Sequence, residues 1–275
     1  MHPGAIAWTA EKIVMSTVLV TGASSGLGEA LAWEFASAGH DLILVARSKE
    51  KLADMAVEIQ DSHSVEVASS PADLSRRGAA SRLASRLHKR GHSVDILVNC
   101  AGVLEHGAFA DIAAPTHQAL IDLNVGGLTA TLSEFLPPMI ERGEGRVLNV
   151  ASIAAFQPVP GLATYAATKA YVLSLGEALS EELKGSGVSL TTLCPGVTDT
   201  NMVSTAQANS EGLDLPGFIV GDAATVAREG YQACIKGDAI CVPGAVNQAV
   251  TLTADVLPRW LVRRMYGLIG RSTLD

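Results

Sequence analysis

Short apolar runs rich in β-branched residues alternate with longer amphipathic segments along the chain. The runs predict strands at residues 16–20, 41–46, 64–68, 94–99, 147–150, 189–193 and 239–242. Strands that alternate with helices form parallel sheets with helices on both faces. We therefore predict an α/β fold, a single doubly wound, Rossmann-like domain of about seven strands over residues 16–245. We assign residues 1–15 to an N-terminal extension and residues 246–275 to a helical tail.

The composition is that of a globular protein, with 48% hydrophobic and 17% charged residues among 275. The net charge of −8 and the pI near 5.4 argue against nucleic acid as a partner, because binding phosphates needs a concentrated basic surface. The sequence has no run of about 18 apolar residues that would predict a membrane-spanning helix. Residues 1–14 lack the basic start and the apolar centre of a secretory signal.

The cysteines show neither a C-x-x-C pair nor histidines at zinc-ligand spacing; they are Cys100, Cys194, Cys234 and Cys241. We therefore expect free thiols and no metal site. Cys100 and Cys194 end predicted strands that would lie two places apart in the sheet, at roughly 10 Å, which is too far for a disulfide. Reduced thiols indicate a cytoplasmic protein.

A glycine-rich turn follows the first predicted strand. Gly22, Gly26 and Gly28 allow the backbone to turn tightly, to approach phosphate groups and to pack a helix against the strand. Backbone N–H groups at the start of the predicted helix 29–38 then provide an anion site. The spacing is G-x-x-x-G-x-G and not the G-x-G-x-x-G of most dinucleotide domains, so an ordinary strand–helix loop is the alternative.

Two polar positions follow the next strands. Domains that bind NAD carry an acidic residue after the second strand, whereas this chain has Arg47 and Ser48. An arginine can bind a 2′-phosphate, so NADP(H) is favoured over NAD(H). The alternative is a surface arginine that opens the predicted helix 49–60. Asp73 is interpreted either as a contact to an adenine amino group or as the N-cap of a helix over 76–89.

The middle of the chain predicts a long helix over residues 115–136, with Asn124 and two glycines inside it. Glycine costs about 1 kcal/mol relative to alanine within a helix, so the pair indicates a local break or close packing. If the helix opens there, the Asn124 carbonyl is free to hold a water. His106 and His117 have no partner in the sequence, and we interpret them as structural.

Tyr165 and Lys169 lie four residues apart at the start of another predicted helix, so their side chains share one face. A nearby ammonium favours the phenolate, which predicts a pKa for Tyr165 below about 10 and proton exchange near neutral pH. Ser152 follows the predicted strand 147–150, where its hydroxyl could hold a substrate oxygen. Taken alone, the pair is better explained by a packed tyrosine beside a solvated lysine, so the rest of the chain must decide.

The last third of the chain contains a further turn that could bind a ligand and two segments whose roles the sequence does not decide. Pro195 and Gly196 follow the sixth predicted strand, where such a turn exposes backbone N–H groups to a ligand. Residues 200–220 are polar without a clear period, which predicts a substrate lid. Residues 257–271 form a basic amphipathic pattern. That helix either contacts a membrane peripherally, covers the substrate site or contacts another subunit.

Six motifs together resemble the short-chain dehydrogenase/reductase family over about residues 16–243: residues 21–28, residues 99–102, Asn124, Ser152, Tyr165-x-x-x-Lys169 and Pro195-Gly196. The resemblance implies a nicotinamide-dependent oxidoreductase that interconverts a small-molecule ketone or aldehyde and an alcohol. The implied catalytic residues are Asn124, Ser152, Tyr165 and Lys169. The implied cofactor-binding residues are Gly22, Ser24, Ser25, Gly26, Leu27, Gly28, Arg47, Ser48, Asp73, Leu74, Asn99, Ala101, Gly102, Tyr165, Lys169, Pro195, Gly196, Val197 and Thr200.

In the roles that the resemblance implies, Tyr165 donates a proton to the carbonyl as the hydride arrives and Ser152 hydrogen-bonds the carbonyl oxygen. Lys169 lowers the pKa of Tyr165 and binds the nicotinamide ribose, while Asn124 holds a water of a proton relay. Cys100 departs from the family, which often has a second asparagine there. Residues 242–259 are similar, more weakly, to a subgroup of uncharacterised bacterial reductases.

Three alternatives remain open at this point. The substrate could be a 3-oxoacyl or steroid-type compound with a long apolar body, and NAD(H) could replace NADP(H). A protein of another class, a non-catalytic NADP(H)-binding sensor, would have no use for the four catalytic residues together. The resemblance also implies a homodimer or a homotetramer.

Overall fold

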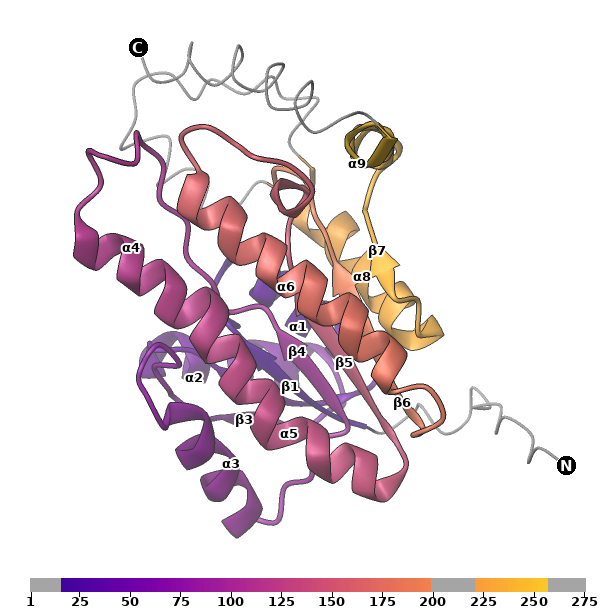
Figure 1. Cartoon of the computed structure of the whole chain (residues 1–275). Helices are drawn as coiled ribbons and strands as arrows, with labels where there is room; N and C mark the ends of the chain where they lie inside the picture. Colours follow the sequence, from indigo (N-terminus) through magenta and orange to yellow (C-terminus); the bar gives the residue numbers. More distant parts are fainter. Residues whose placement is uncertain (1–15, 199–220, 257–275) are drawn as a thin grey trace, which may run out of the picture.

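Within residues 16–198 and 221–256, which the computed structural model describes, seven parallel strands form one sheet in the order β3-β2-β1-β4-β5-β6-β7 (Figure 1). The strands are β1 (Thr17–Thr21), β2 (Asp41–Val45), β3 (Val67–Ser69), β4 (Ile96–Asn99), β5 (Gly145–Val150), β6 (Val188–Leu193) and β7 (Ile240–Cys241). Every pair of neighbours is parallel, so the predicted parallel sheet is confirmed.

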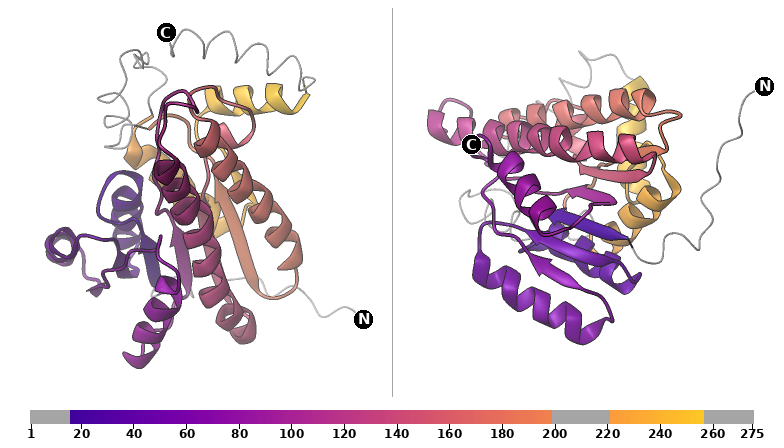
Figure 2. Two further views of the ribbon diagram at one scale, coloured as in Figure 1. Left: turned by 60° about the vertical axis from the view of Figure 1, so that its left-hand side comes forward. Right: turned by 90° about the horizontal axis from the view of Figure 1, so that it is seen from below.

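Helices cover both faces of this sheet (Figure 2). One face carries α1 (Gly26–Ser37), α2 (Lys49–Ser62) and α8 (Ala223–Lys236), and the other carries α3 (Ala79–Lys89), α5 (Leu128–Arg142) and α6 (Ala163–Glu182). Buried side chains alternate along β1, because Leu19 joins the core under α3, α5 and α6 while Val18 and Val20 join the core under α1, α2 and α8. The two cores confirm the doubly wound architecture.

The order in which the strands are added reverses beside β1. β2 and β3 lie on one side of β1, and β4 to β7 follow on its other side. Thr21, the last residue of β1, is in register with Asn99, the last residue of β4. In open parallel sheets ligands bind beyond the carboxyl ends of the strands where the order reverses. The turns that follow β1 and β4 therefore form the centre of the expected crevice.

A continuous helical segment replaces the single helix predicted over residues 115–136. It consists of α4 (Ala114–Ile121), a π-helical turn η2 (Asp122–Gly127) and α5. A Cβ on Gly127 would lie only 2.8 Å from the Leu74 carbonyl oxygen, so close packing accounts for that glycine. The π-helical turn contains Asn124, and such turns frequently occur at functional sites.

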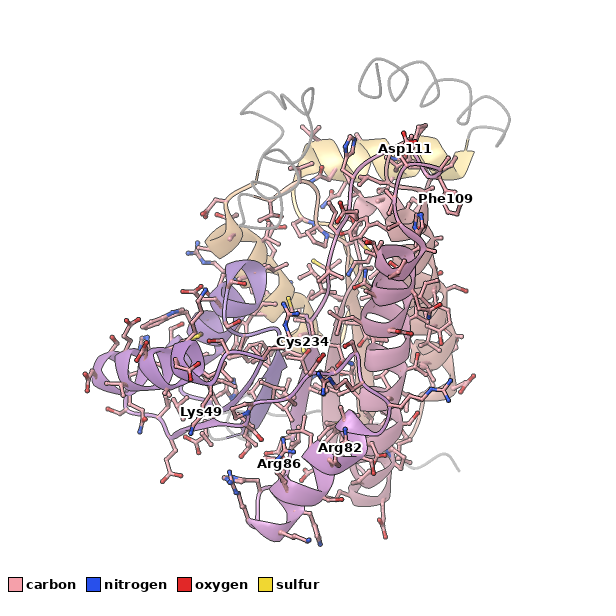
Figure 3. All side chains as sticks on the ribbon, turned by 90° about the vertical axis from the view of Figure 1, so that its left-hand side faces the viewer. Lys49, Arg82, Arg86, Phe109, Asp111 and Cys234 are labelled. Atoms are coloured by element: carbon pink, nitrogen blue, oxygen red, sulfur yellow. The ribbon has the colours of Figure 1, made fainter. Side chains whose placement is uncertain are left out.

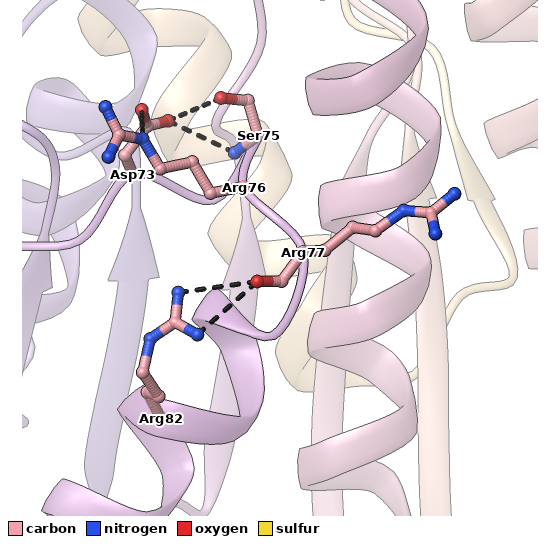
Figure 4. A network of polar contacts seen from close by, with 5 residues as sticks. All are labelled: Asp73, Ser75, Arg76, Arg77 and Arg82. Carbon is pink, nitrogen blue, oxygen red and sulfur yellow. Dashed lines mark hydrogen bonds and ion pairs between the residues drawn. The ribbon is translucent and has the colours of Figure 1, made fainter.

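Two boundaries after β2 also differ from the prediction. β3 spans residues 67–69 rather than 64–68, and α3 begins at Ala79 rather than at residue 76. The residue before α3 is Gly78 with φ +72°, a conformation that favours glycine. The interpretation of Asp73 as the N-cap of α3 is therefore wrong. Its carboxylate instead accepts hydrogen bonds from the backbone and side chain of Ser75 and pairs with Arg76 (Figure 4).

The C-terminal part of the described chain is a helix, α9 (Ala245–Val256), which follows β7 after a short turn. We assigned residues 246–275 to a helical tail and recognised an amphipathic pattern only from residue 257 onwards, so the bounds of α9 were not predicted. The predicted N-terminal extension, the lid at residues 200–220 and the basic pattern at residues 257–271 lie outside the described residues.

A buried histidine precedes β2. The His40 side chain has no exposed surface, and its ring packs edge-on against Phe35 at 5.7 Å between centroids. Within the described part of the chain, neither ring nitrogen has a hydrogen-bond partner. Burial lowers the pKa of His40 below 6.5, although the charges of Asp41 and Asp95 oppose this shift. The folded protein therefore holds His40 neutral at neutral pH.

We expect the free energy of unfolding to fall as the pH drops below 6.5, because the unfolded chain then binds a proton at His40 that the folded protein excludes. The loss from this group is at most about 1.4 kcal/mol per pH unit and ends at the folded-state pKa. His40→Leu should lack this part of the pH dependence. Urea unfolding of both proteins above and below pH 6.5 measures the difference, and identical pH slopes would contradict the expectation.

Candidate active site

The turn between β1 and α1 forms a cradle of glycines. Gly22 (φ +70°) and Gly26 (φ +58°) adopt left-handed conformations that favour glycine. A Cβ on Gly28 would overlap the Gly22 carbonyl oxygen, so α1 packs directly against the turn. The first N–H groups of α1 lack helical carbonyl partners and provide an anion site. Ser24, Ser25 and Leu27 lie on the same turn, and the Ser25 side chain makes no capping hydrogen bond.

Thr21 joins this turn to the turn after β4. Its hydroxyl donates to the Val98 carbonyl at 3.2 Å and accepts from the backbone N–H groups of Cys100 and Ala101 at 3.0 and 3.1 Å. A Cβ on Gly22 would lie 2.8 Å from the Ala101 Cα, so the two turns are in direct contact. No role was predicted for Thr21, although it stands immediately before the first glycine of the motif.

The side chain of Asn99, a predicted cofactor residue, is buried at the end of β4. Its Nδ2 donates to Oδ1 of Asn149 on β5 at 3.0 Å. This amide pair holds the ends of the two strands together. Asn149 is a second supporting residue that the sequence analysis missed, because nothing in the local pattern of β5 distinguishes it from the residues around it.

Arg47 and Ser48 follow β2 at the same edge of the sheet. Ser48 caps α2, because its hydroxyl accepts from the Lys51 backbone N–H at 3.3 Å. Arg47 is exposed, and no hydrogen bond or ion pair holds its guanidinium among the described residues. Asp73 follows β3. The pKa of its carboxyl is lowered, mainly by the hydrogen bond from the Ser75 hydroxyl and further by the Ser75 N–H and by Arg76. Asp73 therefore carries a charge near neutral pH.

Asn124 is fixed in the π-helical turn by three hydrogen bonds. Its side-chain amide exchanges two bonds of 2.9 Å with the backbone of Val103 and donates to the Thr168 hydroxyl at 3.1 Å. Thr168 in turn donates to the Tyr165 carbonyl at 2.7 Å. Asn124 therefore connects the loop after β4 to the first turns of α6. Thr168 is a further residue of the site that sequence reasoning missed, although it directly precedes Lys169.

Tyr165 and Lys169 lie side by side on α6, and both side chains are buried. The Lys169 ammonium is 5.7 Å from the centroid of the Tyr165 ring and donates to the Val150 carbonyl, the last of β5, at 2.9 Å. A Cβ on Gly102 would lie 3.6 Å from the Lys169 Nζ and 3.2 Å from the Asn124 Oδ1. The structure therefore brings the turn after β4, Asn124 and the Tyr165–Lys169 pair together.

Ser152 reaches the same place from β5. It follows β5 by two residues and caps a short 3-10 helix, η3 (Ile153–Ala155), by accepting from the Ala154 N–H at 3.1 Å. Its side chain also interacts with Tyr165 and lowers the pKa of the phenol in part. The four residues predicted to be catalytic thus lie around one position at the carboxyl edge of the sheet.

The prediction that Lys169 lowers the pKa of Tyr165 below its usual range is wrong for this structure. Burial raises the pKa of Tyr165 to about 12 and outweighs the opposing contribution of Ser152. Burial also lowers the pKa of Lys169 to about 8, since an ammonium with few water contacts is costly. Desolvation therefore dominates at both groups. It keeps the phenol protonated at neutral pH.

The turn after β6 completes the edge of the crevice. The Ile153 N–H donates to the Pro195 carbonyl at 2.9 Å, which ties this turn to the residue that follows Ser152. Gly196 comes next, and the Val197 carbonyl accepts from the Gly221 N–H at 2.8 Å. Thr200, another predicted cofactor residue, lies outside the described residues.

The family model for short chain dehydrogenases matches residues 16–211. This chain belongs to the short-chain dehydrogenase family. It is 34% identical over 182 residues, 66% of this chain and 78% of the relative, to an uncharacterized oxidoreductase of Staphylococcus saprophyticus. As a short-chain dehydrogenase, it is an enzyme that acts on alcohol and carbonyl groups with a nicotinamide cofactor.

Two solved structures resemble the whole fold of this short-chain dehydrogenase. A short-chain dehydrogenase from Sphingobium yanoikuyae in complex with NADPH has a TM-score of 0.75 and 31% identity, covering 89% of this chain and 97% of that one. A bulky-bulky ketone specific alcohol dehydrogenase from Comamonas testosteroni has a TM-score of 0.74 and 28% identity, covering 90% of this chain and 96% of that one. Both similarities extend beyond the family model into the C-terminal part.

The residues at the switch point fit a nicotinamide dinucleotide. At Gly22 and Gly28 a Cβ would collide with the backbone of Ala101 and of Gly22, so the glycines let the two turns and α1 pack closely. This packing brings the N–H groups at the start of α1 to the carboxyl edge of the sheet, where a pyrophosphate binds in such folds. Gly102 leaves the space beside Lys169 and Asn124 free of a side chain. The chain's own residues therefore provide an anion site at one end and the candidate catalytic residues at the other.

The four cysteines are free, as predicted. Burial raises the pKa of Cys100 to about 11, so this thiol beside Lys169 stays protonated near neutral pH. No helix among residues 16–198 and 221–256 combines the length and the apolar character that crossing a bilayer requires.

His117 has a structural role, as the sequence analysis predicted. Its ring nitrogens bond the Phe109 carbonyl at 3.1 Å and the Thr164 hydroxyl at 2.8 Å, and its ring stacks on Phe109. It thereby ties the loop after β4 to the start of α6. This loop lies at the opposite end of the molecule from Arg82 and Arg86 of α3 (Figure 3).

Proposed function

We propose that this protein reduces a ketone or aldehyde to an alcohol with NADPH, or catalyses the reverse reaction, with Tyr165 as the acid and base. The observation that carries the proposal is the arrangement of Tyr165, Lys169, Ser152 and Asn124 at the carboxyl edge of the sheet, next to the glycine cradle. A non-catalytic sensor is disfavoured, because binding a nucleotide requires none of this buried proton-transfer machinery.

In reduction, the bound nicotinamide supplies a hydride to the carbonyl carbon. Tyr165 gives its phenolic proton to the carbonyl oxygen, so that one hydride and one proton form the alcohol. Burial favours this role, since the raised pKa keeps a proton on the phenol until the oxygen becomes basic. Ser152 holds the carbonyl oxygen. Lys169 stabilises the phenolate that remains, because its ammonium lies beside the ring.

The hydrogen bonds around Asn124 and Lys169 support a route by which Tyr165 regains its proton. Lys169 is already held by the Val150 carbonyl, and its pKa of about 8 allows it to exchange protons near neutral pH. Asn124 lies in the π-helical turn, where its side chain is committed to Val103 and Thr168. We propose that Asn124 acts through its backbone carbonyl in a relay that reprotonates Tyr165.

Arg47 supports NADP(H) as the cofactor. It is exposed at the carboxyl end of β2, no described residue pairs with it, and a 2′-phosphate would supply the missing anion. The structure from Sphingobium yanoikuyae contains NADPH, which points the same way. NAD(H) remains the alternative, in which Arg47 would be a solvated surface residue.

Arg47→Ala should lower the preference for NADPH over NADH, expressed as the ratio of kcat/KM values, by about tenfold or more, because charge-assisted hydrogen bonds to the phosphate are lost. Lys49→Ala is the matched control. It removes an exposed cation two residues away at the start of α2 and should leave the ratio unchanged. A wild-type protein that prefers NADH would contradict the proposed role of Arg47.

A bulky apolar substrate is the second proposal. Tyr165 packs in an apolar cluster with Leu120, Ala154 and Ala166, against which Val159 and Leu162 of the loop before α6 also pack. The similarity to an alcohol dehydrogenase specific for bulky-bulky ketones supports the same class. A 3-oxoacyl or steroid-type carbonyl is one such compound. A screen of ketones and aldehydes that follows NADPH absorbance tests the proposal of a bulky apolar substrate. Turnover of only small polar carbonyls would contradict that proposal.

An exposed apolar groove on the outer side of α4 and α6 supports the proposal of a homodimer or homotetramer. The groove has a volume of about 390 Å³ and is lined by Phe109, Ile121, Val125, Ala163, Thr164, Ala167 and Thr168. Phe109 and Ile121 are 64% and 42% exposed in the single chain. Cytoplasmic location and peripheral membrane contact through residues 257–271 stay predictions.

A further inference from the structure

Gly196 lies in the turn after β6 and has no left-handed backbone conformation to explain a glycine. The reason is a neighbour from the far end of the chain. A Cβ on Gly196 would lie 2.6 Å from Nδ2, 2.7 Å from Oδ1 and 2.9 Å from Cγ of Asn247, the third residue of α9. The Asn247 amide therefore occupies the space that a side chain at position 196 would need.

The position of the Asn247 side chain is determined by a second contact. Its Nδ2 donates to the Pro243 carbonyl at 2.8 Å, between β7 and α9. Its Oδ1 has no hydrogen-bond partner among the described residues. The neighbouring amide of Gln248 makes a similar bond, to the Val242 carbonyl at 3.0 Å, whereas the three atoms nearest to a Cβ on Gly196 all belong to Asn247. Asn247 is thus held between the start of α9 and the turn after β6.

The turn that Asn247 contacts is joined directly to the candidate catalytic residues. The Pro195 carbonyl accepts from the Ile153 N–H at 2.9 Å, one residue after Ser152. The Thr198 hydroxyl donates to the Gly196 carbonyl at 3.2 Å, which shapes the rest of the turn. A displacement of Gly196 would therefore move both the backbone N–H groups of the turn and the segment that carries Ser152.

We propose that Asn247 is a positioning residue for the cofactor turn, through which the packing of α9 and the binding of NADP(H) are thermodynamically coupled. The inference rests on the proposed function and on the prediction that the turn at Pro195 and Gly196 binds the cofactor. If the packing of α9 orders the turn after β6, it raises the affinity for the cofactor. Thermodynamic linkage then requires that the bound cofactor stabilises the packed position of α9 by the same factor. Neither Asn247 nor Gly196 is a catalytic residue.

Substitutions at the two contacting positions test the coupling. Asn247→Ala and Gly196→Ala should each weaken NADPH binding by about fivefold or more, because the first removes the support of the turn and the second displaces the amide. In the double variant the new methyl group takes the space that the amide leaves, so the loss should be smaller than the sum of the single losses. The dissociation constant comes from a titration of NADPH fluorescence. Gln248→Ala is the matched control and should bind NADPH like the wild type.

Amide hydrogen exchange of residues 245–256, with and without NADPH, separates positioning from general support of the fold. NADPH should slow exchange in α9 of the wild type and of Gln248→Ala but not of Asn247→Ala. Unchanged NADPH affinity in Asn247→Ala, additive losses in the double variant, or equal protection of α9 in all variants would each overturn the inference while the proposed function stands. A wild-type protein that does not bind NADPH would overturn both.

Discussion

Tyr165→Phe is expected to lower kcat by about 10²- to 10⁴-fold, because the substitution removes the group that exchanges a proton with the substrate oxygen. The NADPH dissociation constant should stay within about twofold of the wild type, since only the hydroxyl is lost. The ring packs among Leu120, Ala154 and Ala166, and phenylalanine preserves those contacts. Steady-state kinetics at saturating NADPH, together with a binding titration, measures both quantities.

Tyr171→Phe on the same helix is the matched control. Its hydroxyl bonds the Thr129 hydroxyl at 2.9 Å near the surface, away from Lys169 and Ser152. Removing one exposed hydrogen bond changes stability little, and kcat should stay that of the wild type. If Tyr165→Phe retains wild-type turnover, Tyr165 is not the proton donor and the proposed mechanism is wrong. If both variants lose activity equally, the effect is structural rather than chemical.

The sheet and the place of the crevice could be predicted from the sequence because both depend on patterns within a few residues. The apolar runs predicted the strands, and the glycines after Thr21 marked the turn at the switch point. The register of Thr21 with Asn99 then follows from the geometry of a parallel sheet. The two glycines beside Asn124 indicated an irregular helix, and the structure has a π-helical turn there.

What the sequence did not predict depends on contacts between distant residues or on solvent exclusion. Asn247 and Gly196 meet only because α9 folds back onto the turn after β6, and no local pattern encodes that contact. The pKa of Tyr165 was predicted in the wrong direction, since spacing reveals a neighbouring charge but not the burial that outweighs it. One of the two interpretations of Asp73, as a helix cap, was wrong because the left-handed Gly78 before α3 was not foreseen.

Gly28→Ala is expected to lower the free energy of unfolding by about 3 kcal/mol or more and to abolish measurable NADPH binding. The new Cβ would overlap the Gly22 carbonyl oxygen and lie 2.7 Å from its carbon. The oxygen and the carbon both belong to the Gly22 backbone, so no side-chain rotation relieves the clash. Helix α1 must move away from the turn, which separates the N–H groups at its start from the turn that shapes the anion site.

Gly126→Ala adds the same methyl group within a helical segment, where the nearest atom outside its own turn is the Ile121 carbonyl oxygen at 3.8 Å. This control should keep the thermal midpoint, since the space is open and alanine favours the helix. Thermal unfolding and NADPH titration of both variants provide the comparison. If Gly28→Ala is as stable as Gly126→Ala and binds NADPH, then the close contact of α1 with Gly22 does not form the cofactor cradle.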